Sequence, residues 1–293
     1  MESDIITLDN AAVSSSEVMA MRVKIFFAAL VVSFLGILEG AVMDEQKGTA
    51  EKQTAWEALG VSQKSYEEFA IFWDGLNKNT AKPGNFAVPR VVVWLNGAPG
   101  AGKGTNSIYV CDAFRITQPP VVTSSLLDSP AFKKIKDSGK LVDDNDVTML
   151  VFKHILDKKY ADGVLVDGYP RTMVQAEWIK LLHDAITRAN QKSDFQVVIL
   201  NVAEKVSIER QLWRGQQATA NNEKVKATGR GEIIPIRQTD IDPAAAKERY
   251  QVFARQTKDA LRVLKNTFPC YNIQADGSFS DVKAEIYDSL RKK

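Results

Sequence analysis

The sequence has few of the residues from which disulfide frameworks and metal centres are usually built. Its 293 residues include two cysteines, Cys111 and Cys270, and two histidines, His154 and His183. The cysteines lack CxxC spacing and the histidines lie far apart, so we expect neither a disulfide framework nor a histidine metal site. We interpret both cysteines as small buried residues of a protein from a reducing compartment.

The chain also lacks a strong charge of one sign and a long apolar run. Its net charge is +2, which does not indicate a nucleic-acid partner. One apolar run, residues 25–38, follows Arg22 and Lys24, and it falls short of the roughly 20 residues that span a bilayer. We expect an N-terminal extension over residues 1–44. Its residues 25–43 either associate with a membrane or target the chain, or they form a buried or interfacial helix.

Residues 45–89 are polar but carry an amphipathic helical pattern. The large apolar residues that recur at helical spacing are Trp56, Phe69, Phe72, Trp73 and Leu76. Such a stripe is more typical of a helix that packs on a core than of a functional site. We therefore expect an accessory helical segment here.

From Arg90 onward, short apolar runs alternate with helical patterns, which predicts an α/β fold with a parallel sheet. Strands are expected within residues 90–96, 119–125, 163–169, 195–202 and 270–275. Helices are expected near residues 103–113, 126–138, 143–158, 172–189 and 204–214, followed by a polar stretch at 215–236. A long helix should begin with Asp242 as its N-cap and Pro243 at its first position, and Ser280 should cap the last helix.

Residues 97–105 read GAPGAGKGT and lie between a buried-strand pattern and a helix. Glycine lets the backbone turn sharply, so that several N–H groups can point at one anion, and the helix N-terminus adds positive potential. Lys103 then supplies a mobile charge for the β and γ phosphates of a nucleotide. This loop therefore predicts a nucleotide-binding site.

The loop resembles the phosphate loop of adenylate kinases and their uridylate/cytidylate kinase relatives, because Gly104 separates Lys103 from Thr105. A second motif, DGYPRT at residues 167–172, makes the resemblance specific. It implies a P-loop NTPase fold, a three-layer αβα sandwich with a five-stranded parallel sheet, over residues 90–293. It also implies a small acceptor-binding insertion at about 123–140 and a lid at about 215–236.

The resemblance assigns roles to individual residues. The ATP-binding residues would be Gly97, Ala98, Pro99, Gly100, Ala101, Gly102, Lys103, Gly104, Thr105 and Arg210. The residues that bind the nucleoside monophosphate would be Thr123, Lys140, Val142, Gly168, Arg171 and Gln175. The charges that act in catalysis would be Lys103, Arg171, Arg214, Arg237 and Arg249. Asp167 would hold Mg²⁺, through water, beside the ATP phosphates. No general base or covalent nucleophile is expected, because phosphoryl transfer depends on positioning and charge stabilisation.

Two departures from the family pattern concern the acceptor and the lid. The acceptor-binding segment is short, and Asp128 stands where family members usually carry an arginine, so either Lys133, Lys134 or Lys136 replaces that arginine or the acceptor differs. In the lid, the usual R-x-D-D becomes Arg237-Gln-Thr-Asp240, and Arg230 competes with Arg237 for the arginine's place.

The expected function is Mg-ATP-dependent phosphoryl transfer to a nucleoside monophosphate, with AMP as the favoured acceptor. The alternatives are a P-loop kinase of another small molecule and an inactive nucleotide-binding module. Partners should be nucleotides rather than nucleic acid, and the chain should be a monomer. A cytoplasmic location is favoured over a membrane-associated or organellar one, because Arg22 and Lys24 would keep the N-terminus inside and a spanning segment would place the kinase where ATP is scarce.

Overall fold

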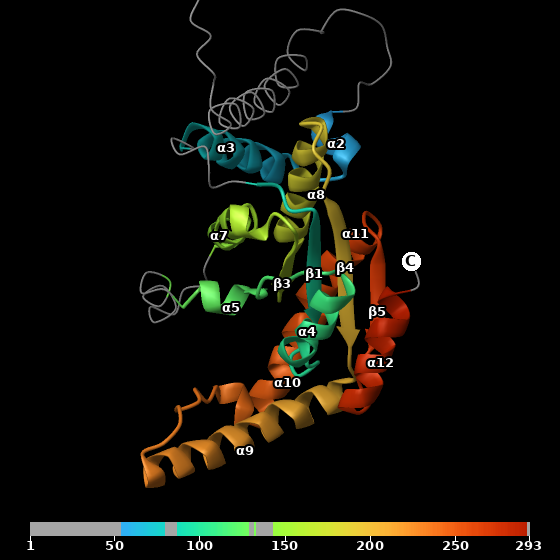
Figure 1. Ribbon diagram of the computed structural model, residues 1–293. Helices are drawn as coiled ribbons and strands as arrows, with labels where there is room; N and C mark the ends of the chain where they lie inside the picture. The colour runs from blue at the N-terminus through green and yellow to red at the C-terminus, as the bar shows by residue number, and fades with distance from the viewer. Residues whose placement is uncertain (1–53, 80–86, 129–131, 133–142, 292–293) are drawn as a thin grey trace, which may run out of the picture.

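The computed structural model describes residues 54–79, 87–128, 132 and 143–291 (Figure 1). The predictions for the N-terminal extension, for most of the helix near 126–138, and for Lys140 and Val142 lie outside these residues. Among the helices that are described, none is long and apolar enough to cross a membrane.

A five-stranded parallel sheet forms the centre of the fold, as the sequence predicted. Its strands lie in the order β2-β3-β1-β4-β5. Their bounds are β1 Val91–Gly97, β2 Val121–Val122, β3 Val164–Asp167, β4 Asp194–Asn201 and β5 Cys270–Gln274. Leu95 of β1 is aligned with Asp167 of β3, and Gly97 is aligned with Leu200 of β4. The carboxyl ends of the three central strands therefore meet at one edge, which is where parallel sheets bind ligands.

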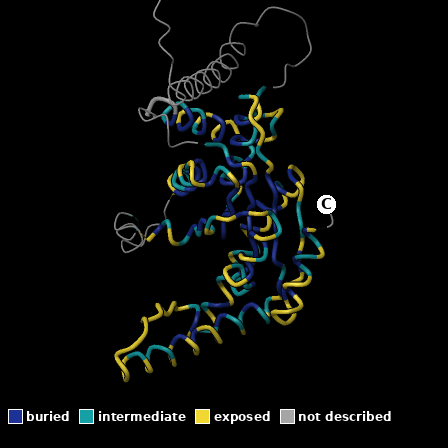
Figure 2. The backbone as a smooth tube through the Cα atoms, in the orientation of Figure 1, coloured by how far each residue is buried: buried dark blue, intermediate teal, exposed yellow. Residues whose placement is uncertain are grey.

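Helices cover both faces of the sheet and make a three-layer αβα sandwich. Successive residues of β1 point to opposite faces. Val92 and Trp94 join a core formed with helices α3, α7, α8 and α11, whereas Val91, Val93 and Leu95 join a second core formed with α4 and α12. The helices have these bounds: α3 Gln63–Asn79, α4 Lys103–Ala113, α7 Asp144–Ile155, α8 Met173–Arg188, α11 Lys258–Lys265 and α12 Phe279–Leu290. Strands β1 and β3 are buried along their whole length and β4 along most of its length, and Figure 2 shows this central region as buried.

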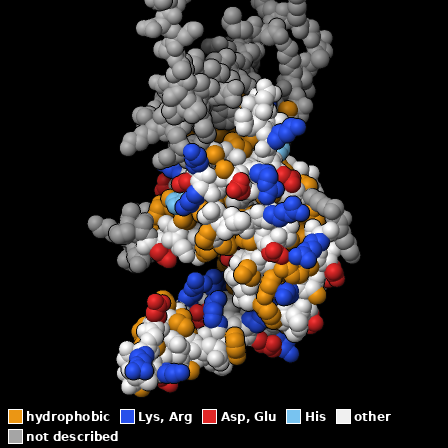
Figure 3. Space-filling view, viewed as in Figure 1, with side chains coloured by type: hydrophobic (Ala, Val, Ile, Leu, Met, Phe, Trp, Pro, Cys, Tyr) orange, Lys and Arg blue, Asp and Glu red, His pale blue; other side chains and the backbone are white. Residues whose placement is uncertain are grey.

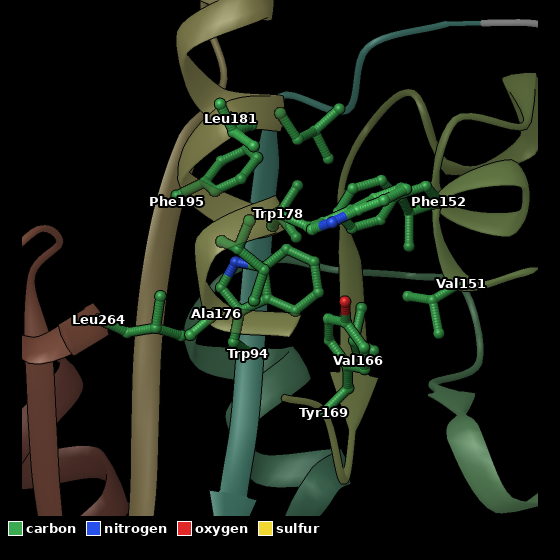
Figure 4. Close-up of a cluster of buried hydrophobic side chains, with 14 of the residues drawn as sticks. Trp94, Val151, Phe152, Val166, Tyr169, Ala176, Trp178, Leu181, Phe195 and Leu264 are labelled. Atoms are coloured by element: carbon green, nitrogen blue, oxygen red, sulfur yellow. The ribbon is translucent and has the colours of Figure 1, made fainter. Parts of the chain in front are cut away.

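Aromatic side chains fill the first core. The ring of Trp94 lies 5.6 Å from that of Tyr169, and the ring of Phe152 lies 6.3 Å from that of Trp178 (Figure 4). Tyr169 lies two residues after β3 and is fully buried, with its hydroxyl donating to Thr148 Oγ1 at 2.9 Å. Packing of this kind fixes the turn that carries residues 167–172 against α7 and α8.

Helix α9, Glu204–Thr228, corrects one prediction, because it continues through much of the stretch expected to be an irregular lid. Residues 215–228 contain no proline and are rich in Ala, Gln, Lys and Glu, which favour a helix, so the helix ends only at Gly229 in a left-handed conformation. The outer half of α9 projects from the body as an arm (Figure 1). The chain returns along it to the short 3-10 helix η2, Gln238–Asp240.

Two smaller boundaries also differ from the predictions. Thr123, expected in a strand, begins the short helix α5, Thr123–Leu126, because β2 ends at Val122. The cap of α12 is Ser278, not Ser280, since the Ser278 hydroxyl accepts from the Asp281 N–H in a capping box. Asp242 is confirmed as the N-cap of α10, Pro243–Val252, which runs through a π-helical turn, Phe253–Thr257, into α11.

The segment before the sheet forms two helices, α2 Ala55–Leu59 and α3. The predicted apolar stripe is buried for Phe69, Phe72, Trp73 and Leu76, and Trp56 is partly buried. These side chains belong to the same core as α7 and α8, so α3 is an integral layer of this side of the molecule.

Candidate nucleotide-binding site

The glycine loop follows β1 and leads into α4, whose first residue is Lys103. The loop passes so close to its neighbours that side chains do not fit at two positions. A Cβ at Gly97 would lie 2.4 Å from the Leu200 carbonyl oxygen, and one at Gly100 would lie 2.6 Å from that of Ser207. Gly100 also has φ of +74°, which favours glycine. The loop is therefore clamped between β4 and the start of α9, and its N–H groups have a fixed direction.

Lys103 turns inward over this loop. Its Nζ donates to the carbonyl oxygens of Gly97 at 2.7 Å and Ala98 at 3.1 Å. Burial lowers the pKa of the ammonium to about 8, against the attraction of Asp167, and the nearby cations Arg171, Arg249 and Arg214 lower it further. An anion bound in the loop would supply the countercharge that the site lacks.

Asp167 ends β3 next to this lysine and is 9% exposed. Burial raises the pKa of its carboxyl group, although Lys103 and Arg171 oppose the change. Only its backbone oxygen accepts a hydrogen bond within the described part of the chain, from Thr123 Oγ1 at 3.0 Å. A desolvated carboxylate without hydrogen-bond donors is a suitable ligand for a divalent cation. The Thr105 side chain lines the same cavity and offers a further oxygen.

Four arginines from different elements lie close enough to act on one another electrostatically. Together with Arg210, Asp167 and the glycine loop, they line a cavity of about 790 Å³. Arg171 follows β3, Arg214 lies on α9, Arg237 precedes η2 and Arg249 lies on α10. Figure 3 shows Lys and Arg side chains gathered where the α9 arm meets the body. The sequence predicted all four as site residues, and the fold brings them together with Lys103.

The cations outnumber the carboxylates in this cavity, and their mutual repulsion shows in their pKa values. Burial lowers the pKa of Arg249 to about 10, and Arg237, Arg214 and Arg171 add to the decrease. The pKa of Arg171 is also lowered, chiefly by burial. Asp167 opposes this decrease and Arg237 adds to it. An arrangement that holds like charges close together is suited to binding several phosphate groups.

The lid side of the cavity is anchored by an ion pair between Arg214 and the buried Asp240. Asp240 also accepts from the Arg237 N–H at 3.3 Å, and Arg249 donates to Thr239 Oγ1 at 3.2 Å. Here α9 touches η2 so closely that a Cβ at Gly215 would lie 1.9 Å from the Asp240 carbonyl oxygen. Arg237 lines the cavity while Arg230 is exposed outside it, so the geometry favours Arg237 of the two lid candidates.

The far end of the cavity has aromatic walls that the sequence analysis missed. Trp213, 62% exposed, and Phe279, 52% exposed, both line it. Arg210 also lines the cavity, and its guanidinium donates to the carbonyls of Ala275, Asp276 and Gly277 at 2.6, 3.1 and 2.9 Å. Trp213 directly precedes Arg214 in the sequence, and this position next to a predicted site residue could have indicated it.

Two of the predicted acceptor residues lie behind the cavity rather than on its wall. Thr123 is buried against β3, and Gln175 is buried at the start of α8. Gln175 Oε1 accepts from the Arg171 N–H at 2.7 Å, and its Nε2 donates to Asp144 Oδ1 at 2.8 Å. Asp144, which the sequence did not indicate, also accepts from Thr172 Oγ1 at 2.8 Å. It therefore supports the end of the DGYPRT turn.

Pro99, Gly100, Gly102, Lys103, Gly104, Thr105, Gly168 and Arg210 line the cavity, whereas Gly97, Ala98 and Ala101 form the loop behind it. Asp128 is exposed and lies outside the cavity lining. Its proposed substitutes, Lys133, Lys134 and Lys136, lie outside the described residues.

Comparisons with known proteins agree with this geometry. Residues 95–268 match the family model described as Adenylate kinase. A curated relative from Fusobacterium nucleatum subsp. nucleatum, called Adenylate kinase, is 28% identical over 209 residues, which cover 67% of this chain and 96% of the relative. The matched family span includes the glycine loop and all five arginines of the cavity, and it leaves α2, α3 and α12 outside.

Proposed function

Because the chain belongs to the adenylate kinase family, whose activity is phosphoryl transfer to a nucleoside monophosphate, we propose that it converts Mg-ATP and AMP to two ADP. The observation that carries this proposal is the meeting of six cations, one lysine in the loop and five arginines outside it, around a single cavity. Two carboxylates in the same region, Asp167 and Asp240, leave a large positive surplus. Two nucleotides with several phosphates between them would balance it.

In this mechanism the chain binds and orients the two nucleotides and stabilises the charge on the transferring phosphoryl group. Lys103 leaves the carbonyls of Gly97 and Ala98 and binds the donor phosphates, while Arg171 holds the acceptor phosphate with its planar fork. Arg214, Arg237 and Arg249 stabilise the charge on the transferring group. The outer part of α9 and residues 229–236 act as the lid that excludes water, so that ATP is not hydrolysed.

Asp167 and Thr105 are the residues that would hold Mg²⁺, since both offer oxygen atoms in the cavity beside the loop. The bound ion would neutralise part of the phosphate charge. Asp167 is suited to bind the ion, because its carboxylate is fixed at the end of a central strand and accepts no hydrogen bond within the described residues.

The preference for AMP rests on the name of the curated relative, Adenylate kinase, and on the prediction that Gln175 reads the acceptor base. Gln175 is 3% exposed and lies behind the cavity in this structure. One lone pair of its Oε1 and one hydrogen of its Nε2 are used internally, which leaves one acceptor site and one donor, the pattern that pairs with an adenine edge. Base reading by Gln175 therefore requires that this side chain becomes accessible when the acceptor binds.

A coupled assay of the full chain with ATP, Mg²⁺ and AMP, CMP, UMP or dAMP tests the proposal. We expect nucleoside diphosphate formation, fastest with AMP. No turnover with any of the four would refute the proposed function and favour a different acceptor or an inactive binding module. Higher turnover with a pyrimidine acceptor would refute the preference alone.

The pH dependence of ATP capture provides a second test. The pKa of Lys103 lies at about 8 rather than at its ordinary 10.5, so the free protein loses this charge as the pH rises through about 8. We expect kcat/KM for ATP to fall above that pH, approaching tenfold per pH unit, measured at saturating AMP. At saturating ATP, kcat should stay flatter, because bound phosphates raise the lysine pKa.

Lys103→Arg is the matched control for that profile, since a guanidinium stays charged across the range. The variant should be slower, yet its kcat/KM should lack the decrease near pH 8. The same decrease in both proteins would show that a group other than Lys103 causes the loss of kcat/KM near pH 8.

A further inference from the structure

Helix α3 lies outside the span that matches the family, yet it bridges two helices that carry acceptor-side residues. The ring of Phe69 meets that of Trp178 on α8 edge to face at 5.6 Å. The ring of Phe72 lies 5.6 Å from Trp178 and 6.1 Å from Phe152 on α7. One face of α3 therefore contacts both α7 and α8 and sets their relative position.

Polar contacts tie α3 to the same two helices. Ser62 Oγ, just before α3, donates to Glu177 Oε2 on α8 at 2.7 Å, and Ser65 Oγ donates to the same oxygen. On the other side, Asn145 Nδ2 donates to Glu68 Oε2 at 3.0 Å. Asn145 is the second residue of α7, so Glu68 holds the first turn of that helix.

The first turn of α7 is the support of the DGYPRT turn. Asp144, next to Asn145, accepts from Gln175 Nε2 and from Thr172 Oγ1, both at 2.8 Å. Gln175 in turn accepts from the Arg171 N–H at 2.7 Å. A continuous series of hydrogen bonds and one peptide link therefore runs from Glu68 to the backbone of Arg171.

We propose that α3 is a positioning element for the nucleoside monophosphate site, and that Glu68 is its positioning residue, acting through Asn145 and Asp144 on Gln175 and Arg171. That the ligand is a nucleoside monophosphate rests on the proposed function, whereas the effect of Glu68 on the position of Arg171 does not. Glu68 is not among the described residues that line the cavity, so the geometry assigns it to affinity for the acceptor and not to binding of the ATP phosphates by the loop.

The test compares three variants of the full chain. Glu68→Leu removes the acceptor oxygens at similar size, and Glu68→Gln keeps one. Glu67→Leu alters the exposed neighbour, whose only hydrogen bond within the described residues is accepted from Gln63 of α3. We expect Glu68→Leu to raise KM for AMP by about threefold to thirtyfold, the range of coupling through intermediate residues, with KM for ATP within twofold of wild type. Glu68→Gln and Glu67→Leu should match wild type.

A second readout does not depend on turnover. Hydrogen exchange of the Arg171 amide, which Gln175 protects, should be faster in Glu68→Leu than in Glu68→Gln. Adding Asn145→Ala to Glu68→Leu should produce no further change in KM or exchange, because both act through one contact.

The outcomes separate the two proposals. An inactive wild type would refute the proposed function, and the exchange measurement would still decide the positioning role. An active wild type whose variants share one KM for AMP and one exchange rate would overturn the positioning role alone. So would equal increases in both KM values, or a loss of melting temperature without a change in KM for AMP.

Discussion

Lys103→Met is expected to lower kcat for ADP formation by about 10²- to 10³-fold, the loss typical of one charge-stabilising group at a reacting centre. Methionine has a similar length and no charge, so it fits the space without offering a donor to the phosphates. Lys103 is the one cation of the cavity that lies within the glycine loop, and its Nζ already lies 2.7 Å from the loop carbonyl of Gly97.

The same substitution should not destabilise the protein. The folded state lowers the pKa of Lys103 from 10.5 to about 8, so between those values it binds fewer protons than the unfolded state, and stability rises with pH through that window. Below about pH 8 the charged lysine costs stability, and methionine removes that cost at the expense of two hydrogen bonds. We expect a melting temperature at pH 7 no lower than that of wild type.

Steady-state assay and thermal denaturation of the purified full chain measure both effects. Lys205→Met is the matched control, because Lys205 is 86% exposed on α9 and pairs only weakly with Glu209 at 4.0 Å. Its kcat should equal that of wild type. A Lys103→Met protein as active as its control would mean that phosphoryl transfer is not the function of this site.

Arg249→Ala is expected to reduce kcat by about 10³-fold or more, the range for arginines that stabilise a transferring phosphoryl group. Arg249 extends from α10 into the cavity, where Arg171, Arg214 and Arg237 act on its pKa. Its removal takes away positive charge where the transition state is most negative. Arg249→Lys keeps the charge but loses the planar fork, so an intermediate decrease is expected.

Arg255→Ala is the control for this prediction. Arg255 lies within two turns of Arg249, is 63% exposed and pairs with Glu248 at 2.7 Å outside the cavity. We expect wild-type kcat for this variant. The rise in melting temperature on adding ATP should also be smaller for Arg249→Ala than for Arg255→Ala, because Arg249→Ala removes a charge from the cavity in which we propose that the phosphates bind. Equal kcat values for the two variants would exclude Arg249 from the reaction.

The interior of the fold could be predicted because its signals are local. Each strand was a short apolar run, and Asp242 with Pro243 was a correct helix start, since propensity and capping depend on neighbouring residues. The errors came where local signals were ambiguous. Residues 215–228 are polar enough for a loop yet helical by propensity, and Ser278 and Ser280 both resemble caps, so that only the side-chain contact with Asp281 distinguishes them.

Site residues that belong to a recognisable sequence motif were predicted, whereas those that only packing brings to the site were missed. The motifs GAPGAGKGT and DGYPRT indicated Lys103, Asp167 and Arg171. Trp213 and Asp144 belong to neither motif. Their places depend on how α9 crosses the cavity and on where α7 meets the turn after β3. Gln175 was predicted to read a base, and its two internal hydrogen bonds, with Arg171 and with Asp144, became visible only in three dimensions.

By itself, the sequence determined the five-stranded parallel sheet, the phosphate loop and the charges available to it, because these follow from periodicity, glycine spacing and residue type within short windows. The tertiary structure decided which charges meet. Arg171, Arg214, Arg237 and Arg249 come from four elements, and only the packing of α9, η2 and α10 at the carboxyl edge of the sheet brings them to Lys103. It also decided that α3 joins the acceptor side, because Phe69 and Phe72 bury apolar surface against α7 and α8 that would otherwise face water.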